Sequence, residues 1–474
     1  MDIVVHRPAT PVPIPSNNNS NKESAMNARV HALTELIDRS PISALQVRVL
    51  VLCFLIVLLD GFDTAAIGYI APELIRDWGI ERTALAPAFG AGLFGMLLGS
   101  FCFGPLADRH GRKTVLLVCV LIIAGGTLAC ALAPSIEVLA ALRFATGIGL
   151  GGVLPNCITL SSEYSPARRR MLLVTLSYSG FTLGLALGGG LAGWLLPLIG
   201  WQGLLVVGGL APLLLWPVLF YGLPESVCFM ASQARHRAAL VRTLERIAGR
   251  GDWARRLDNL AAAPSHAPAV RTSIAALFSA GQLPRTLLLW LTFFCCLFVF
   301  YLLTNWLPTV LRASGYATTE AAHISAMMPF GGVLGGIAMA LLMDRIGALR
   351  ILPWLCLVAS LALVLVSTQL GSAWGTLGIV FLAGFSLTGA LNNLSVVAAT
   401  LYPMTSRATG VAWALAAGRA GSIIGSMLGG WLFAEAGELG RFFVWIALPV
   451  LLASLALGLM QRMANRQETV AATA

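Results

Sequence analysis

Two carboxylates lie inside the first long apolar stretch of the chain, within the sequence Leu59-Asp60-Gly61-Phe62-Asp63-Thr64. The stretch that precedes the two carboxylates, residues 49–59, is uncharged, and so is the stretch that follows them, residues 64–71. About 20 apolar residues span a bilayer core, so both side chains fall within it. An ionised Asp at that depth costs roughly 2.5–3.5 kcal/mol on insertion scales. Because Asp60 and Asp63 are three residues apart, they share one helix face.

This pair of carboxylates has two interpretations. Either residue could pair with an intramembrane Arg and hold helices together, which is a structural role. Alternatively, Asp60 and Asp63 form a transport or proton site that faces protein or a water-filled cavity. Desolvation in such a cavity favours the neutral acid, so an Asp can take up a proton on one side of the membrane and release it on the other. We expect Asp60 and Asp63 to couple protons.

The composition indicates a membrane protein with many spans. Of the 474 residues, 57% are hydrophobic and only 11% are charged, against about 25% charged in soluble proteins. The net charge of +10 comes almost wholly from Arg residues scattered between apolar runs, which argues against a nucleic-acid partner. The nine Cys and six His show no metal-ligand spacing, so we expect no metal and no other cofactor.

Twelve apolar runs of near-spanning length fall into two groups of six around one long hydrophilic segment. Their approximate limits are 47–70, 84–106, 114–133, 138–160, 171–196, 201–222, 285–307, 319–343, 349–370, 374–399, 408–430 and 441–461. We therefore expect an all-α membrane protein with twelve transmembrane helices in two six-helix bundles, 46–222 and 285–461. The other expected segments are a disordered cytoplasmic tail at 1–45, a cytoplasmic linker at 223–284 with a helix around 231–250, and a cytoplasmic C-terminal tail at 462–474.

The distribution of basic residues predicts the orientation. Most of the 31 Lys and Arg residues lie in the two termini and in the loops that follow even-numbered spans. Cytoplasmic loops carry such an excess. Both termini and the linker are therefore expected on the cytoplasmic side.

Short motifs recur in the two halves of the chain. Asp108-Arg109-His110-Gly111 follows the second span, and Asp344-Arg345-Ile346-Gly347 follows the eighth. Tyr164 and Tyr402 close the fourth and tenth spans in the same way. These matches suggest a duplicated six-span unit, and parallel repeats of this kind are a feature of secondary transporters.

Several motifs resemble those of the major facilitator superfamily. They are Gly104-Pro105-Leu106-Ala107-Asp108-Arg109-His110-Gly111-Arg112-Lys113, Arg143 with Gly147, Gly149, Gly151 and Gly152, and Pro224-Glu225-Ser226. Within that superfamily, other motifs look like the aromatic acid:proton symporters, especially the 4-hydroxybenzoate/protocatechuate transporters. These are Asp60-Gly61-Phe62-Asp63, Asn305-Trp306-Leu307-Pro308-Thr309, and Arg407-Ala408-Thr409-Gly410 leading to Gly418-Arg419.

The resemblance implies a secondary active transporter in the inner membrane of a bacterium. It would import a small aromatic carboxylate, hydroxybenzoate-like, together with protons by alternating access. We expect a monomer in the lipid bilayer. The alternatives are a porter of the same fold for another organic anion, a sugar or a drug, and a transporter-fold sensor. An enzyme is not expected, because the spans show no metal set or nucleophile constellation.

Two loop clusters are candidate gates between the halves. The first comprises Gly104, Asp108, Arg109, Gly111 and Arg112, and a weaker second copy comprises Asp344, Arg345 and Gly347. Charges around a tight glycine turn could hold the halves together on one side and release them. The alternative is a signal that only fixes the loop in the cytoplasm. Glu163 with Arg168, at the end of the fourth span, is either a cap with ion pairs or a second gate.

Two intramembrane Arg residues are candidates for the substrate anion. Arg419 lies about 16 Å into the eleventh span at 1.5 Å per residue, near the midplane where transporters bind substrate. A guanidinium binds a carboxylate through two parallel hydrogen bonds and stacks on aromatic rings. Arg419 is therefore expected to bind the substrate carboxylate, or else to pair with Asp60. Arg143 matches Asp63 in depth and is expected to be its partner, with anion binding as its second possible role.

Polar residues of two further spans are candidate substrate contacts. Tyr301 and Asn305 lie on a helical stripe with Phe294 and Phe298, which either packs against protein and lipid or stacks on the substrate ring. Asn392 and Asn393 place hydrogen-bonding groups at the membrane centre. With Tyr301 they are candidates for binding ring hydroxyls.

Overall fold

The computed structural model describes residues 37–38, 40–249, 251, 253, 282–369, 371–402, 407–436 and 439–473. Most of the expected N-terminal tail and the second half of the expected linker lie outside these residues. The described part of the chain is helical and has no strand. Within hydrocarbon, a helix satisfies every backbone hydrogen bond internally, which is why the apolar runs adopt it.

The first group of spans forms five long helices. They are α2 (Ala44–Trp78), α3 (Ala86–His110), α4 (Arg112–Cys130), α5 (Ile136–Glu163) and α6 (Arg170–Gly222), with the short 3-10 helices η1 (Arg82–Leu85) and η2 (Ala167–Arg169) between them. The 53 residues of α6 contain a kink at Gly200, whose φ of 67° interrupts the helical backbone. The fifth and sixth expected spans are thus the two halves of α6. For this reason eleven described helices, long and apolar enough to cross a membrane, account for twelve spans.

The second group forms six helices, α10 (Leu283–Ala313), α11 (Thr318–Ile346), α12 (Ala348–Gln369), α13 (Ala373–Leu401), α14 (Arg407–Glu435) and α15 (Leu439–Thr473). Helix α15 continues to Thr473, through most of the segment expected to be a tail. Between the groups lie α7 (Val227–Ser232), η3 (Ala234–His236) and α8 (Arg237–Ala248). The helix predicted around 231–250 is confirmed by α8.

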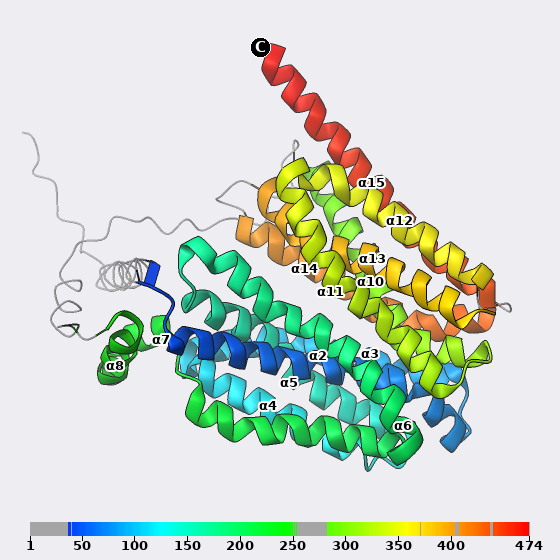
Figure 1. Ribbon diagram of the computed structural model, residues 1–474, viewed down its shortest axis with the longest axis horizontal. Coiled ribbons are helices and arrows are strands. Elements are labelled where there is room, and N and C mark those ends of the chain that lie inside the picture. Colours follow the sequence, from blue (N-terminus) through cyan, green and yellow to red (C-terminus); the bar gives the residue numbers. More distant parts are fainter. Residues whose placement is uncertain are drawn as a thin grey trace, which may run out of the picture.

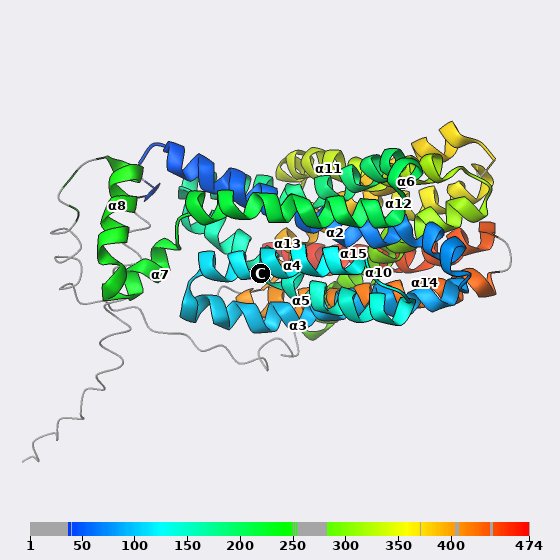
Figure 2. The same ribbon diagram turned by 90° about the horizontal axis from the view of Figure 1, so that it is seen from below.

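Helices α2–α6 and α10–α15 form two bundles, with α7 and α8 beside one end of the first (Figures 1 and 2). We call this the linker end, and the opposite end the far end. The bundles contact each other toward the far end. There Thr318 donates a 3.0 Å hydrogen bond to Glu73, and the rings of Phe89 and Trp306 lie 5.1 Å apart.

The turns that end α3 and α11 support the duplication suggested by the sequence. Gly111 caps α3 with φ 97° and ψ 148°, and Gly347 caps α11 with φ 96° and ψ 139°. A residue with a side chain rarely adopts such a φ. Both halves therefore use glycine to make the same turn.

Glycines in the first half of α6 pack this helix closely against α2. A Cβ at Gly184 would overlap the backbone carbonyl of Leu58 on α2, and a Cβ at Gly180 would crowd that of Phe54. Glycines allow two helix backbones to approach closely in a membrane. This contact fixes α6 against the helix that carries Asp60 and Asp63.

We predict that Gly184→Ala lowers the free energy of unfolding of the purified protein, by about 1–3 kcal/mol, because overpacking forces the helices apart. Gly190→Ala is the matched control, since no atom lies within 4 Å of a Cβ at that position of α6. Thermal unfolding in detergent measures both variants. Equal stability of the two would contradict the packing described here.

Candidate functional site

Asp63 is held by side chains from two neighbouring helices. It is 1% exposed on α2, and its Oδ2 lies 3.0 Å from Nη1 of Arg143 on α5. Thr127 of α4 donates a 2.5 Å hydrogen bond to Oδ1. The pairing with Arg143 expected from depth is therefore confirmed. Each buried charge of this pair is compensated by the other, so removing one partner would leave an unpaired charge in the protein interior.

Asp60 lies one turn earlier on α2 in a different environment. It is also 1% exposed, yet neither of its carboxylate oxygens has a hydrogen-bond partner among the described residues. Burial of an ionised carboxylate without a hydrogen bond is strongly disfavoured. The two carboxylates that the sequence presents as a pair thus differ in chemistry.

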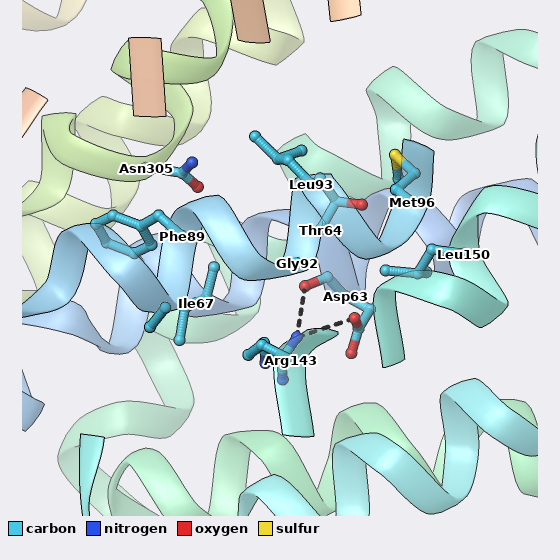
Figure 3. Close-up of a pocket in the computed structure, with 11 residues that line it drawn as sticks. Asp63, Thr64, Ile67, Phe89, Gly92, Leu93, Met96, Arg143, Leu150 and Asn305 are labelled. Atoms are coloured by element: carbon cyan, nitrogen blue, oxygen red, sulfur yellow. Dashed lines mark hydrogen bonds and ion pairs between the residues drawn. The ribbon is translucent and has the colours of Figure 1, made fainter. Parts of the chain in front are cut away.

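A pocket opens beside Asp63 at the junction of the two bundles (Figure 3). Its lining comes from α2, α3, α5 and α10, and consists of Asp63, Thr64, Ile67, Ala88, Phe89, Gly92, Leu93, Met96, Arg143, Leu150 and Asn305. Most of this wall is apolar, with few polar groups, which is the usual make-up of a site for a small organic molecule.

Arg419 of α14 reaches this pocket from the other bundle. Its Nη1 lies 2.9 Å from the sulfur of Met96, a pocket residue. The half-buried guanidinium also lies close enough to Asp60 and to the Tyr301 hydroxyl to interact with both. No carboxylate oxygen of the described chain lies within 4.0 Å of it. The alternative of a close ion pair with Asp60 is therefore absent from this structure.

The other candidate substrate contacts are only partly available. Asn305 lines the pocket and donates a 2.8 Å hydrogen bond to Ser426, which leaves its carbonyl oxygen as an acceptor. Asn393 donates to the Gly389 carbonyl of its own helix at 2.8 Å, and Asn392 lies half-buried beside Gly336. Neither Asn392 nor Asn393 lines the pocket. Of the candidate substrate contacts, Asn305 lines the pocket, and Tyr301 interacts with Arg419.

The candidate gate at the linker end is organised around Glu163. Arg112 at the start of α4 lies 3.1 Å from Glu163 Oε1, and Ser226 donates a 2.5 Å hydrogen bond to Oε2. Asp108 is 73% exposed and lies 3.7 Å from Arg112. The buried carboxylate of this cluster is therefore Glu163, and Asp108 lies on the surface.

Glu225 completes the cluster from the segment after α6. It accepts hydrogen bonds from the backbone N–H groups of Lys113, at 3.0 Å, and Ser226, at 2.9 Å. A Cβ at Gly111 would overlap its carboxylate, so the glycine serves this contact as well as the turn. Burial, with Glu163 nearby, raises the pKa of the Cys228 thiol to about 11, so the thiol adds no charge here.

The remaining candidate gate residues are more exposed. Arg168 is exposed in η2, and Glu163 pairs with Arg112 in place of it. Arg109 and Arg345 are exposed, and no atom lies within 4 Å of a Cβ at Gly104. The side chain of Asp344 lies outside the described residues. The second copy of the cluster therefore repeats the glycine turn, while Glu225 belongs only to the first.

Four residues that make contacts in these sites were not identified from the sequence. Thr64, Thr127 and Met96 are ordinary residues of apolar spans, and no pattern of types marks them. Glu225 is different, because it lies in the Pro224-Glu225-Ser226 motif. An acidic residue directly after a span, opposite a basic loop, could have indicated an ion-pairing role.

Two bundles of membrane-spanning helices with a buried polar site between them define a secondary transporter. The chain belongs to the Major Facilitator Superfamily, whose family profile matches residues 53–400 and 289–473.

Curated relatives cover nearly the full length. The chain is 42% identical to the 4-hydroxybenzoate transporter PcaK of Pseudomonas aeruginosa, over 89% of this chain and 93% of the relative. It is also 42% identical to a gallate transporter of Pseudomonas putida, with coverage of 89% and 93%.

Solved structures share the fold. A bacterial homolog of the human lysosomal transporter Spinster, inward-facing and unoccupied, aligns with a TM-score of 0.67 and 18% identity, covering 89% of this chain and 98% of that one. The inward open xylose transporter XylE from Escherichia coli aligns with a TM-score of 0.66 and 16% identity, covering 87% and 95%.

We predict that Asp63→Asn destabilises the protein much more than Asp60→Asn. The first change leaves Arg143 as a buried charge without its counterion, which costs about 3–5 kcal/mol. The second removes no hydrogen bond or close ion pair among the described residues. Thermal unfolding of the two purified variants, which differ only in position, measures this contrast. A larger loss of stability in Asp60→Asn would contradict the roles given to the two carboxylates.

Proposed function

We propose that this protein imports a small aromatic carboxylate, hydroxybenzoate-like, together with protons across the inner membrane of a bacterium. Relatives with 42% identity over most of their length are named as 4-hydroxybenzoate and gallate transporters, which supports an aromatic acid as the substrate. The observation that carries the proposal is the Arg419 guanidinium. It contacts Met96 in the wall of a mostly apolar pocket and has no carboxylate oxygen within 4.0 Å in the described chain.

The substrate anion needs a cation where it leaves water. An unpaired carboxylate in a low-dielectric cavity is strongly disfavoured, and Arg143 is already paired with Asp63 at 3.0 Å. Arg419 is therefore the better partner. Its planar guanidinium can bind both carboxylate oxygens, and the apolar wall between Phe89 and Met96 accommodates the ring. Tyr301 and Asn305 supply hydrogen-bonding groups beside it.

The proton travels on Asp60 in this proposal. Asp60 is buried with no hydrogen-bond partner among the described residues and interacts with Arg419, so its charge state and the occupancy of Arg419 affect each other. A substrate carboxylate bound to Arg419 removes the cation's attraction for an ionised Asp60 and favours its protonation. When the site opens to water on the other side, the acid can ionise and the substrate can leave. Asp63, fixed by Arg143, positions the helix and does not carry the proton.

Contacts at the far end and at the linker end of the molecule support alternating access. The far end is closed by inter-bundle contacts such as Thr318 with Glu73. At the linker end, the cluster of Arg112, Glu163 and Glu225 connects helices within the first bundle, and exposed Asp108 is free to contact the second bundle when that end closes. The excess of basic residues in the loops at this end supports a cytoplasmic linker end and cytoplasmic termini.

The test of this proposal is direct binding of 4-hydroxybenzoate to the purified protein at fixed pH. We predict that Arg419→Lys, which keeps the charge but loses the two-pronged geometry, weakens binding by about 1.5–3 kcal/mol, and that Arg419→Ala weakens it further. Arg350→Ala, an exposed Arg of the same bundle, is the control and should leave affinity unchanged. Unchanged affinity in Arg419→Ala would move the anion site elsewhere, with Arg143 as the next candidate.

A further inference from the structure

Thr64 is a polar residue of the pocket that no interaction within the described protein explains. It is 9% exposed, and its hydroxyl has no hydrogen-bond partner among the described residues. Threonines in helices commonly donate to the carbonyl four residues earlier. Several do so here, namely Thr146, Thr159, Thr243, Thr292 and Thr304. The Thr64 hydroxyl makes no such bond, although burying a hydroxyl unpaired is unfavourable.

The Thr64 hydroxyl faces the pocket. Thr64, Leu93 and Met96 line the same space, and the hydroxyl oxygen points into the region between the other two side chains (Figure 3). Met96 in turn contacts Arg419 at 2.9 Å. The mostly apolar pocket wall therefore includes Met96, which contacts a cation, and Thr64, whose hydroxyl has no partner among the described residues.

Arg419 and Thr64 approach the pocket from different bundles. Thr64 lies one helical turn beyond Asp60 on α2, about 6 Å along the helix axis at 1.5 Å per residue. Arg419 lies on α14 and contacts Met96, which lines the pocket together with Thr64. A carboxylate bound at Arg419 would place a hydroxyl at the opposite end of the ring near Thr64, whereas a hydroxyl adjacent to the carboxylate would stay beside Arg419.

We propose that the Thr64 hydroxyl hydrogen-bonds the ring hydroxyl para to the substrate carboxylate, and so selects phenolic acids over unsubstituted aromatic acids. This inference rests on the proposed function. A hydroxyl can both donate and accept, so it accommodates a phenol in either orientation. A site built to hydrogen-bond a substrate hydroxyl discriminates against an analogue that lacks it, because the protein hydroxyl is then left unpaired.

The test compares three ligands, 4-hydroxybenzoate, benzoate and 2-hydroxybenzoate, by competition binding to the purified protein. Thr64→Val keeps the shape of the side chain and removes a hydroxyl without a partner in the described chain, so the variant should fold. We expect its Kd for 4-hydroxybenzoate to rise about tenfold, the loss of one buried hydrogen bond. The Kd values for benzoate and 2-hydroxybenzoate should not change.

Three further variants make the result specific. Thr64→Ser retains the hydroxyl and should keep the preference for 4-hydroxybenzoate. Thr64→Ala also removes the hydroxyl and should lose the preference as Thr64→Val does, even if valine fits poorly. Thr388→Val is the matched control, since the Thr388 hydroxyl is likewise buried and unpartnered in the described chain but packs against Gly332. It should leave all three affinities unchanged.

Two outcomes would overturn the role of Thr64. One is an unchanged Kd for 4-hydroxybenzoate in Thr64→Val and Thr64→Ala, and the other is an equal loss of affinity for all three ligands. Failure of the proposed function gives a different result, because the unmodified chain would then bind none of the three acids, and the role of Thr64 would fall with it.

Discussion

The structure depends on how two buried carboxylates on one helix share the available cations. Asp63 is neutralised by Arg143 and held by Thr127, whereas Asp60 has no close partner in the described chain. Hydrocarbon makes this difference large, since no water compensates an unpaired charge. One carboxylate is therefore a fixed part of the first bundle, and the other has no fixed partner in the described chain. The roles proposed for the two carboxylates rest on that single asymmetry.

The second bundle completes the site by placing Arg419 opposite α2. The guanidinium contacts the first bundle through Met96, at the edge of a pocket whose wall is mostly apolar. A site that joins two bundles at mid-depth is sensitive to their relative position. In this structure the two bundles contact each other at the far end, for example through Phe89 and Trp306. Movement of one bundle against the other would change the access of water to Asp60 and, in the proposed function, of substrate to Arg419. Packed interfaces of this kind switch between discrete arrangements.

The sequence predicted the fold well because hydropathy and charge directly determine which segments lie in the membrane. Twelve spans, the linker helix and the repeated glycine turn were all visible as patterns of residue type. The Asp63–Arg143 pair was also predictable, since two charges at equal depth in one bundle have few other partners. These predictions need only the position of a residue along the membrane normal.

Contacts that depend on the rotation of a helix were not predictable. Glu163 pairs with Arg112 from another helix instead of nearby Arg168, and Asn393 uses its amide on its own backbone. Thr64 is a further example. Its hydroxyl has no hydrogen-bond partner in the described chain, and no residue pattern encodes such an absence.

The central claim is that Asp60 couples proton movement to movement of the aromatic anion. The most direct measurement is uptake of labelled 4-hydroxybenzoate by proteoliposomes, with and without an imposed proton gradient, for the unmodified chain and for Asp60→Asn. The account predicts gradient-driven accumulation by the unmodified chain, and none by Asp60→Asn, although that variant still exchanges substrate down its concentration gradient. Normal gradient-driven accumulation by Asp60→Asn would contradict it.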